Sequence, residues 1–139
     1  KYMKIKTDKN FLKKDCKPIE KNEVSFLVQK MFLEMKKREN SCYGIALNQL
    51  GILKKGFVIN HNGVFKYYIN PEILEFNGKE FINKDEGCLS LKVRGNVKRF
   101  DKITVTDERN GKQTLKGNEA VIFQHELDHI NGKLISDKN

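Results

Sequence analysis

Residues 118–132 read Asn-Glu-Ala-Val-Ile-Phe-Gln-His-Glu-Leu-Asp-His-Ile-Asn-Gly, and this stretch predicts the central element of the fold. Apolar side chains occupy nearly every side of a helix over this range, which is typical of a buried helix. Asn118 is the expected N-cap, and Asn131-Gly132 is the expected stop. The second half of the same helix also carries the polar or charged side chains Gln124, His125, Glu126, Asp128 and His129. Because charged groups are seldom buried without partners, a functional site is expected here.

Within this helix, His125-Glu126-Leu127-Asp128-His129 has the spacing H-E-x-x-H. Two histidines at i and i+4 lie one above the other on a helix face, about 6 Å apart. Both imidazoles can therefore reach one tetrahedral cation, and Glu126 can approach a water beside it without being a ligand. Alone, the motif is moderately specific. The alternative is a pair of packed histidines beside an ion-paired glutamate.

A third ligand is expected upstream, because only Asp137 is an obvious candidate after His129. The chain has three cysteines, which are Cys16, Cys42 and Cys88. Cys88 is favoured, since it follows a predicted strand and has a glycine beside it that frees the backbone for close approach. A thiolate and two imidazoles leave one tetrahedral position open for water, as in catalytic sites. The alternative for a cysteine in this setting is a small buried hydrophobe.

The length of 139 residues fits one domain, 1–139. No apolar run approaches the roughly 18 residues of a membrane-spanning helix, so no membrane association is expected. An odd number of cysteines argues against a disulfide scaffold and favours a reducing, cytoplasmic setting. Lys+Arg 27 and Asp+Glu 18 give a net charge of +9. Two interpretations of this charge are open: the lysines are spread over a solvated surface, or they form a positively charged surface that binds RNA.

Outside 118–132, the sequence predicts one more helix and a set of strands. Apolar residues at helical spacing predict the helix near the N-terminus: Val24, Leu27, Val28, Met31 and Met35. Three Asn-Gly pairs between alternating segments predict hairpins, with strands at 57–60 and 64–69, 73–76 and 80–82, and 103–106 and 113–115. The predicted fold class is α+β, with antiparallel β-strands surrounding a central buried metal-binding helix, plus an N-terminal helix.

Three motifs, in this order, resemble the peptide deformylase family. They are Gly44-Ile45-Ala46-Leu47-Asn48-Gln49, Glu86-Gly87-Cys88-Leu89-Ser90 and Gln124-His125-Glu126-Leu127-Asp128-His129. The resemblance spans nearly the whole chain, and three ordered motifs are far more specific than any one of them. It is a resemblance to short, minimal or phage-like members that lack a further C-terminal helix.

The resemblance implies a metal-dependent amidase that removes the formyl group from formyl-methionine at the N-terminus of nascent peptides. It implies Cys88, His125 and His129 as metal ligands, Glu126 as general base, and Gln49 and the Leu89 backbone N–H as oxyanion donors. The implied substrate-binding residues are Tyr43, Gly44, Glu86, Gly87, Val121 and Ile122, and Arg99 is expected to pair with Glu86. Fe²⁺ is the expected ion, for which Zn²⁺, Ni²⁺ or Co²⁺ can substitute. A monomer with weak ribosome association is expected.

The first motif departs from the family pattern at Cys42, Leu47 and Asn48, where glycine, alanine and often proline stand. A non-glycine at Cys42 is expected to narrow the substrate approach. Two alternatives follow. The chain is a related metallo-amidase or peptidase with shifted acyl specificity, or a basic RNA- or ribosome-binding protein with a structural zinc site. A structural zinc site normally has four protein ligands, which argues against the second alternative.

Overall fold

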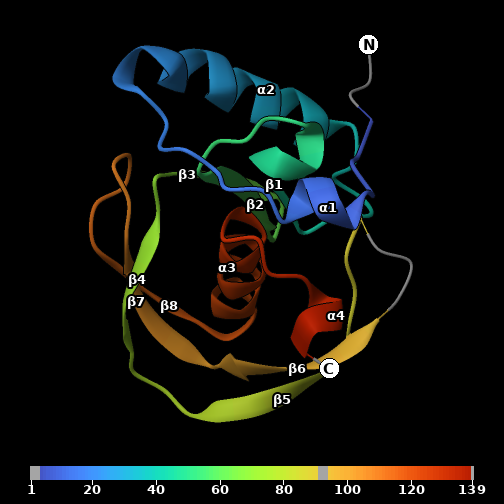
Figure 1. The fold of residues 1–139 in the computed structure, drawn as a ribbon. Helices are drawn as coiled ribbons and strands as arrows, with labels where there is room; N and C mark the ends of the chain where they lie inside the picture. The colour runs from blue at the N-terminus through green and yellow to red at the C-terminus, as the bar shows by residue number, and fades with distance from the viewer. Residues whose placement is uncertain (1–3, 91–93, 139) are drawn as a thin grey trace.

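The fold is a mixed α/β arrangement with antiparallel sheets and few helices, as the sequence predicts. The structure, a computed structural model, describes residues 4–90 and 94–138 (Figure 1). The helices are α1 (Lys9–Leu12), α2 (Val24–Lys36), α3 (Gly117–Ile130) and α4 (Ile135–Lys138), with two short 3₁₀ helices, η1 (Lys21–Glu23) and η2 (Leu47–Leu50). The strands are β1 (Gly44–Ala46), β2 (Gly56–His61), β3 (Val64–Ile69), β4 (Glu72–Phe76), β5 (Glu80–Glu86), β6 (Gly95–Phe100), β7 (Lys102–Thr106) and β8 (Gln113–Lys116).

The strands form three antiparallel sheets, ordered β1-β2-β3, β4-β7-β8 and β5-β6. The predicted hairpin of β2 and β3 is confirmed, with Gly56 opposite Ile69. Its turn residues Asn62 and Gly63 have φ of 52° and 85°, the left-handed backbone that favours Asn-Gly at this place. The predicted pairing of 103–106 with 113–115 is confirmed in β7 and β8.

The predicted hairpin around Asn77-Gly78 is wrong. Strands form on both sides, but β4 pairs with β7 and β5 pairs with β6. The backbone N–H groups of Asn77 and Gly78 both donate to the carbonyl of Lys102, so this turn is held against the start of β7. A local turn signal is here overridden by pairing with strands that come later in the chain.

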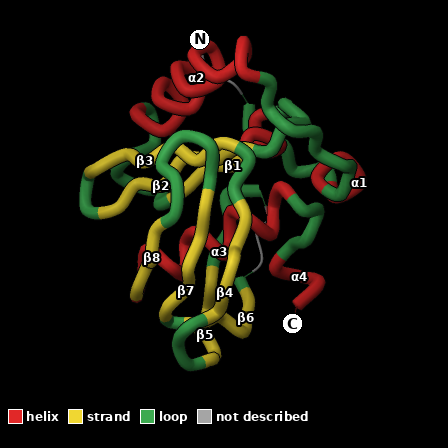
Figure 2. The backbone as a smooth tube through the Cα atoms, turned by 90° about the vertical axis from the view of Figure 1, so that its left-hand side faces the viewer, coloured by secondary structure: helices red, strands yellow, loops and turns green. Residues whose placement is uncertain are grey.

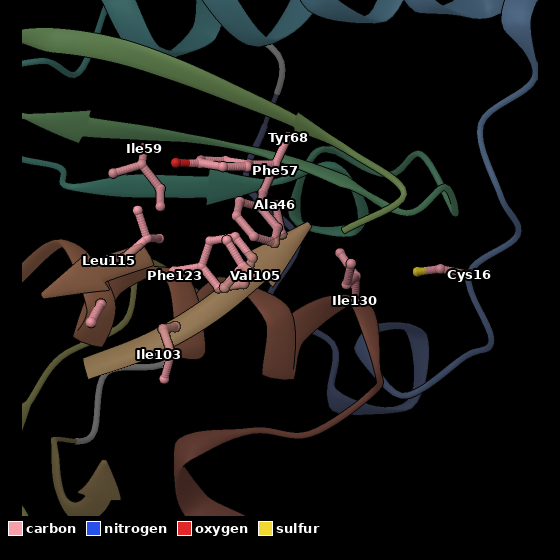
Figure 3. Close-up of a cluster of buried hydrophobic side chains, with 11 residues drawn as sticks. Cys16, Ala46, Phe57, Ile59, Tyr68, Ile103, Val105, Leu115, Phe123 and Ile130 are labelled. Carbon is pink, nitrogen blue, oxygen red and sulfur yellow. The ribbon is translucent and has the colours of Figure 1, made fainter. Parts of the chain in front are cut away.

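Helix α3 lies between the β1-β2-β3 sheet and the other two sheets (Figures 1 and 2). Aromatic rings join it to the first sheet: Phe123 contacts Phe57 and Tyr68 edge to face, with ring centroids 5.1 and 5.0 Å apart (Figure 3). All three side chains are fully buried. On the other side of this sheet, α2 buries Leu27 and Met31. The helix that carries H-E-x-x-H is thus inside the fold.

The two ends of α3 differ in how well the sequence predicts them. The helix begins at Gly117 with Lys116 as N-cap and no side-chain cap, so the prediction of Asn118 as N-cap is wrong. The predicted stop is confirmed, because Asn131 is the C-cap and Gly132 has a φ of 74°. Among residues 4–90 and 94–138, no helix has the length and hydropathy needed to cross a bilayer.

Candidate active site

Three potential metal-ligating side chains meet beside α3. The ligand atoms of Cys88, His125 and His129 all lie within 4.8 Å of one another. His129 Nε2 is 3.2 Å from both the Cys88 Sγ and the His125 Nε2. The histidines come from successive turns of α3, and Cys88 comes from the loop after β5. The distances are short enough for one small cation to contact all three atoms.

A buried ion pair, Glu86 with Arg99, contacts the His125 ring through Nδ1, the nitrogen that does not face His129. The Nδ1 of His125 lies 2.5 Å from Glu86 Oε2. Arg99, on β6, donates to both oxygens of Glu86 at 3.0 and 2.6 Å, which confirms the predicted pairing, and to Asp128 at 2.7 Å. Burial works against the charged carboxylate, but the hydrogen bonds from His125 and Arg99 hold the pKa of Glu86 well below its ordinary value. Glu86 therefore fixes the ring so that Nε2 faces Cys88.

The two imidazoles differ in protonation: burial opposes the charged form of His125, but its hydrogen bonds with Cys88 and Glu86 raise its pKa to about 10. Burial, with a further contribution from His125, lowers the pKa of His129 to about 3. Its side chain is 1% exposed. A neutral imidazole has a free nitrogen lone pair, which is the form that binds a metal ion.

Glu126 is buried next to the cluster and is incompletely hydrogen-bonded. It is 3% exposed, and its Oε1 has no partner among the described residues. Burial raises its pKa to about 7. The carboxylate packs against Gly44 of β1, where the Cβ of any larger residue would lie 2.6 Å from Glu126 Oε2. Only glycine at this position lets the carboxylate lie where it does.

The amide of Gln49 is fixed in one orientation. Its Oε1 accepts from the Ala46 N–H at 3.0 Å, and its Nε2 donates to Ser90 Oγ at 3.0 Å. The same Nε2 lies 3.9 Å from Cys88 Sγ. Because the oxygen is held by the backbone, the NH₂ group is directed toward the cluster.

These groups line one pocket of about 450 Å³. Of the site residues predicted from the sequence, only His129 does not line it and is buried instead. The others all line the pocket: Tyr43, Gly44, Gln49, Glu86, Gly87, Cys88, Leu89, Val121, Ile122, His125 and Glu126. Tyr43 is 73% exposed at the rim, and Leu89 is 38% exposed. Residues from β1, η2, the loop after β5 and α3 thus converge on one cavity.

Two residues have roles at the site that the sequence does not predict. Ser90 orients the Gln49 amide, and Asp128 shares Arg99 with Glu86. Ser90 lies inside one of the three family motifs, but its partner is 41 residues away, so no local spacing signals the contact. Cys42 lines the pocket but does not belong to the ligand cluster. Asp137 lies elsewhere, paired with Lys13 at 3.0 Å.

The chain matches known proteins over nearly its whole length. Residues 3–139 match the family model described as polypeptide deformylase. Peptide deformylase 1 from Clostridium perfringens is 36% identical over 139 residues, covering 94% of this chain and 92% of the relative. The crystal structure of peptide deformylase from Thermotoga maritima has a TM-score of 0.86 and 31% identity, covering 99% and 97% of the two chains.

A second similar structure holds a bound peptide. It is a class I type b peptide deformylase from Acinetobacter baumannii with Met-Ala-Ser bound, with a TM-score of 0.87, 28% identity and 98% of each chain covered. Fold and sequence thus agree. The chain belongs to the polypeptide deformylase family, the metal-dependent hydrolases that remove the formyl group from the N-terminal methionine of nascent peptides.

Proposed function

We propose that Cys88, His125 and His129 hold one divalent ion on α3 and that Glu126 moves the proton during deformylation. The observation that carries the proposal is the meeting of three donor atoms within 4.8 Å beside a buried carboxylate oxygen that has no partner among the described residues. One thiolate and two imidazoles fit a tetrahedral ion with one position left open. This donor set suits Fe²⁺, which we propose as the native ion, and also Zn²⁺, Ni²⁺ or Co²⁺.

When bound, the ion supplies an acidified water and a positive charge for the carbonyl oxygen of the formyl group. Glu126 accepts the proton of the attacking water on its free carboxylate oxygen and returns it to the amine that leaves. Its raised pKa of about 7 suits both directions of transfer near neutral pH. Gly44 supports this role, because it leaves the space that the carboxylate occupies.

Gln49 and the Leu89 backbone N–H are proposed as donors to the oxygen that becomes negative in the transition state. The hydrogen bonds from Ala46 and to Ser90 support Gln49, because they hold its NH₂ group toward Cys88 before substrate arrives. A donor that is already oriented stabilises developing charge without reorganising.

The rest of the pocket is proposed to bind the peptide. Val121 and Ile122 offer apolar surface for the methionine side chain, and Gly44 and Gly87 offer backbone close to the site. Tyr43 stands at the rim, and Glu86 lies at the base with His125. The Met-Ala-Ser complex of the Acinetobacter relative supports a methionine peptide as the ligand class. Since segments as far apart in the chain as Tyr43 and Glu126 supply this one pocket, we also propose that 1–139 is one catalytic domain.

The test is formate release from formyl-Met-Ala-Ser by protein prepared without oxygen and loaded with Fe²⁺ or Ni²⁺, alongside Glu126→Ala. We expect the variant to lose activity by roughly 10²–10⁴-fold while binding one ion per chain. Glu119→Gln, on the same helix but paired with Lys66, is the matched control and should keep its activity. Equal rates for Glu126→Ala and wild type would refute the proposed role. An acetyl-Met peptide in the same assay tests acyl specificity.

A further inference from the structure

Asn48 is a fully buried amide beside the proposed active site, although it does not line the pocket. It lies in η2, one residue before Gln49. Its Nδ2 donates to the carbonyl of His129 at 2.7 Å and to the carbonyl of Leu12 at 3.3 Å. One side chain therefore joins η2 to α1 and to the last turn of α3.

The chemistry of the two partners determines which way the amide faces. Both are carbonyl oxygens, which only accept hydrogen bonds, so the NH₂ group must face them. The amide oxygen, Oδ1, has no partner among the described residues. The contacts of Asn48 are thus made by its two donor hydrogens, and a side chain without donors cannot replace them.

The two histidines of the cluster are held in different ways. His125 has its Nδ1 beside Glu86, which orients the ring. His129 has no partner on Nδ1 within the described part of the chain. Metal-binding histidines are usually oriented through the nitrogen that does not face the ion. For His129, the hydrogen bond from Asn48 to its own carbonyl offers a substitute that acts on the backbone.

We propose that Asn48 is a positioning residue that holds the His129 backbone so that Nε2 faces Cys88 and His125. Because Asn48 adjoins Gln49, the same contact also sets the distance between α3 and the proposed oxyanion donor. This inference rests on the proposed role of His129 as a metal ligand. It assigns a function to one of the positions where the chain departs from the family pattern.

The test compares ion binding in wild type, Asn48→Asp and Asn70→Asp. Asn48→Asp keeps the shape of the side chain, removes both donor hydrogens and places carboxylate oxygens against two carbonyls. Asn70→Asp is the matched control, because Asn70 also joins distant segments, bonding the Ile19 backbone at 2.7 and 3.0 Å, and does not line the pocket. Ion affinity is measured by competition with a chelator, and ligand geometry by the visible absorption of the Co²⁺-loaded protein.

We expect Asn48→Asp to bind the ion about 10–100-fold more weakly and to shift the Co²⁺ spectrum. Asn70→Asp should remain within about twofold of wild type in affinity, with an unchanged spectrum. If Asn48→Asp does not fold, Asn48→Leu carries the test, since it has similar volume, no donor and no charge. A folded Asn48 variant with wild-type affinity and spectrum would overturn the inference. If His129→Ala also keeps wild-type affinity, it is the proposed ligand set that fails.

Discussion

Phe123 and His125 lie two residues apart on α3 but enter environments of opposite kind. Phe123 meets Phe57 and Tyr68 in edge-to-face contacts, where buried rings pack on one another. His125 meets Glu86, which is bound in turn by Arg99, and Arg99 also binds Asp128. One side of the helix is held by packing, and the other by charged hydrogen bonds.

The two sides differ in which of their buried polar atoms have no hydrogen-bond partner among the described residues. In the apolar cluster, the Tyr68 hydroxyl is the buried polar atom without a partner among the described residues. On the polar side, the unpartnered atoms are Glu126 Oε1 and His129 Nδ1. Unpaired buried polar groups cost stability, roughly 1–3 kcal/mol each. Leaving Glu126 Oε1 unpaired therefore costs stability at the atom on which the proposed proton transfer takes place, while packing on the other side holds the helix in place.

The largest expected effect on stability comes from replacing Arg99, the positively charged side chain on the polar side of α3. Arg99→Met leaves the buried Glu86 and the half-buried Asp128 without the cation they share, so we expect the free energy of unfolding to fall by about 3–5 kcal/mol. Urea denaturation measures this loss. Adding Glu86→Gln to Arg99→Met removes one of the stranded charges and should recover part of it. Stability equal to that of wild type in Arg99→Met would show that the ion pair contributes nothing.

A smaller effect is expected from Gly44→Ala, also on the polar side, which should lower activity while stability is kept. Gly44→Ala places a methyl group against the Glu126 carboxylate, which can swing away, so the fold and the bound ion should be retained. Displacement of Glu126, the proposed base, should lower kcat/KM by about 100-fold, measured by formate release. Gly63→Ala is the control, because it lies in an exposed turn at a φ of 85° with nothing within 4 Å of an added Cβ. That change should cost stability and leave kcat/KM unaltered.

On the apolar side, the expected effect is on stability alone. Phe57→Leu removes ring atoms that contact Phe123 and Tyr68, and we expect the free energy of unfolding to fall by roughly 1–2 kcal/mol. The kcat/KM of the folded protein should stay within about twofold of wild type. A loss of activity as large as that of Gly44→Ala would contradict the division of the helix into a packing side and a reacting side.

The smallest effect concerns Cys42, at the edge of the pocket. Its thiol donates to the Gly44 carbonyl at 3.1 Å, and burial, followed by the charge of Glu126, raises its pKa to about 12. In the unfolded chain the thiol ionises at about pH 8.5. The folded protein then binds the extra proton above that pH, so this thiol lowers stability as pH rises from about 8.5 toward 12.

Cys42→Ala removes this pH dependence. From about pH 8 to about pH 9.5, ion-free wild type should lose about 1 kcal/mol more of its unfolding free energy than ion-free Cys42→Ala does. Urea denaturation of both proteins at the two pH values gives the comparison. Parallel losses in the two proteins would mean that the thiol ionises as readily when folded as when unfolded.

The sequence predicts those features that depend on local spacing. Apolar periodicity predicts α2, and the stop at Asn131-Gly132 is where the backbone turns. The partner of Glu86 that the family resemblance implies is also correct, because Arg99 lies on the strand paired with β5. The predicted site residues line one pocket, apart from the buried His129, and their individual roles stay predictions.

Features that depend on distant partners are missed. The Asn77-Gly78 turn predicts a hairpin, but β4 pairs with β7, and the choice between strands is made by contacts across the fold. The three-residue strand β1 is too short for its alternation to be recognised in the sequence. The contacts of Asn48 and Ser90 join residues 81 and 41 positions apart, and neither has a local pattern.

The sequence separation of these contacts also affects when the proposed ion site forms during folding and synthesis of the chain. The proposed ligands and oxyanion donor come from η2, the loop after β5, and α3, with contacts spanning about 40 residues at each step. Long loops must close before such contacts form, which makes them late events in folding. Since α3 follows the other contributing elements, a growing chain has no complete ion site until this helix has docked. The enzyme that processes nascent chains must itself be synthesised through α3 before the proposed ion site can form.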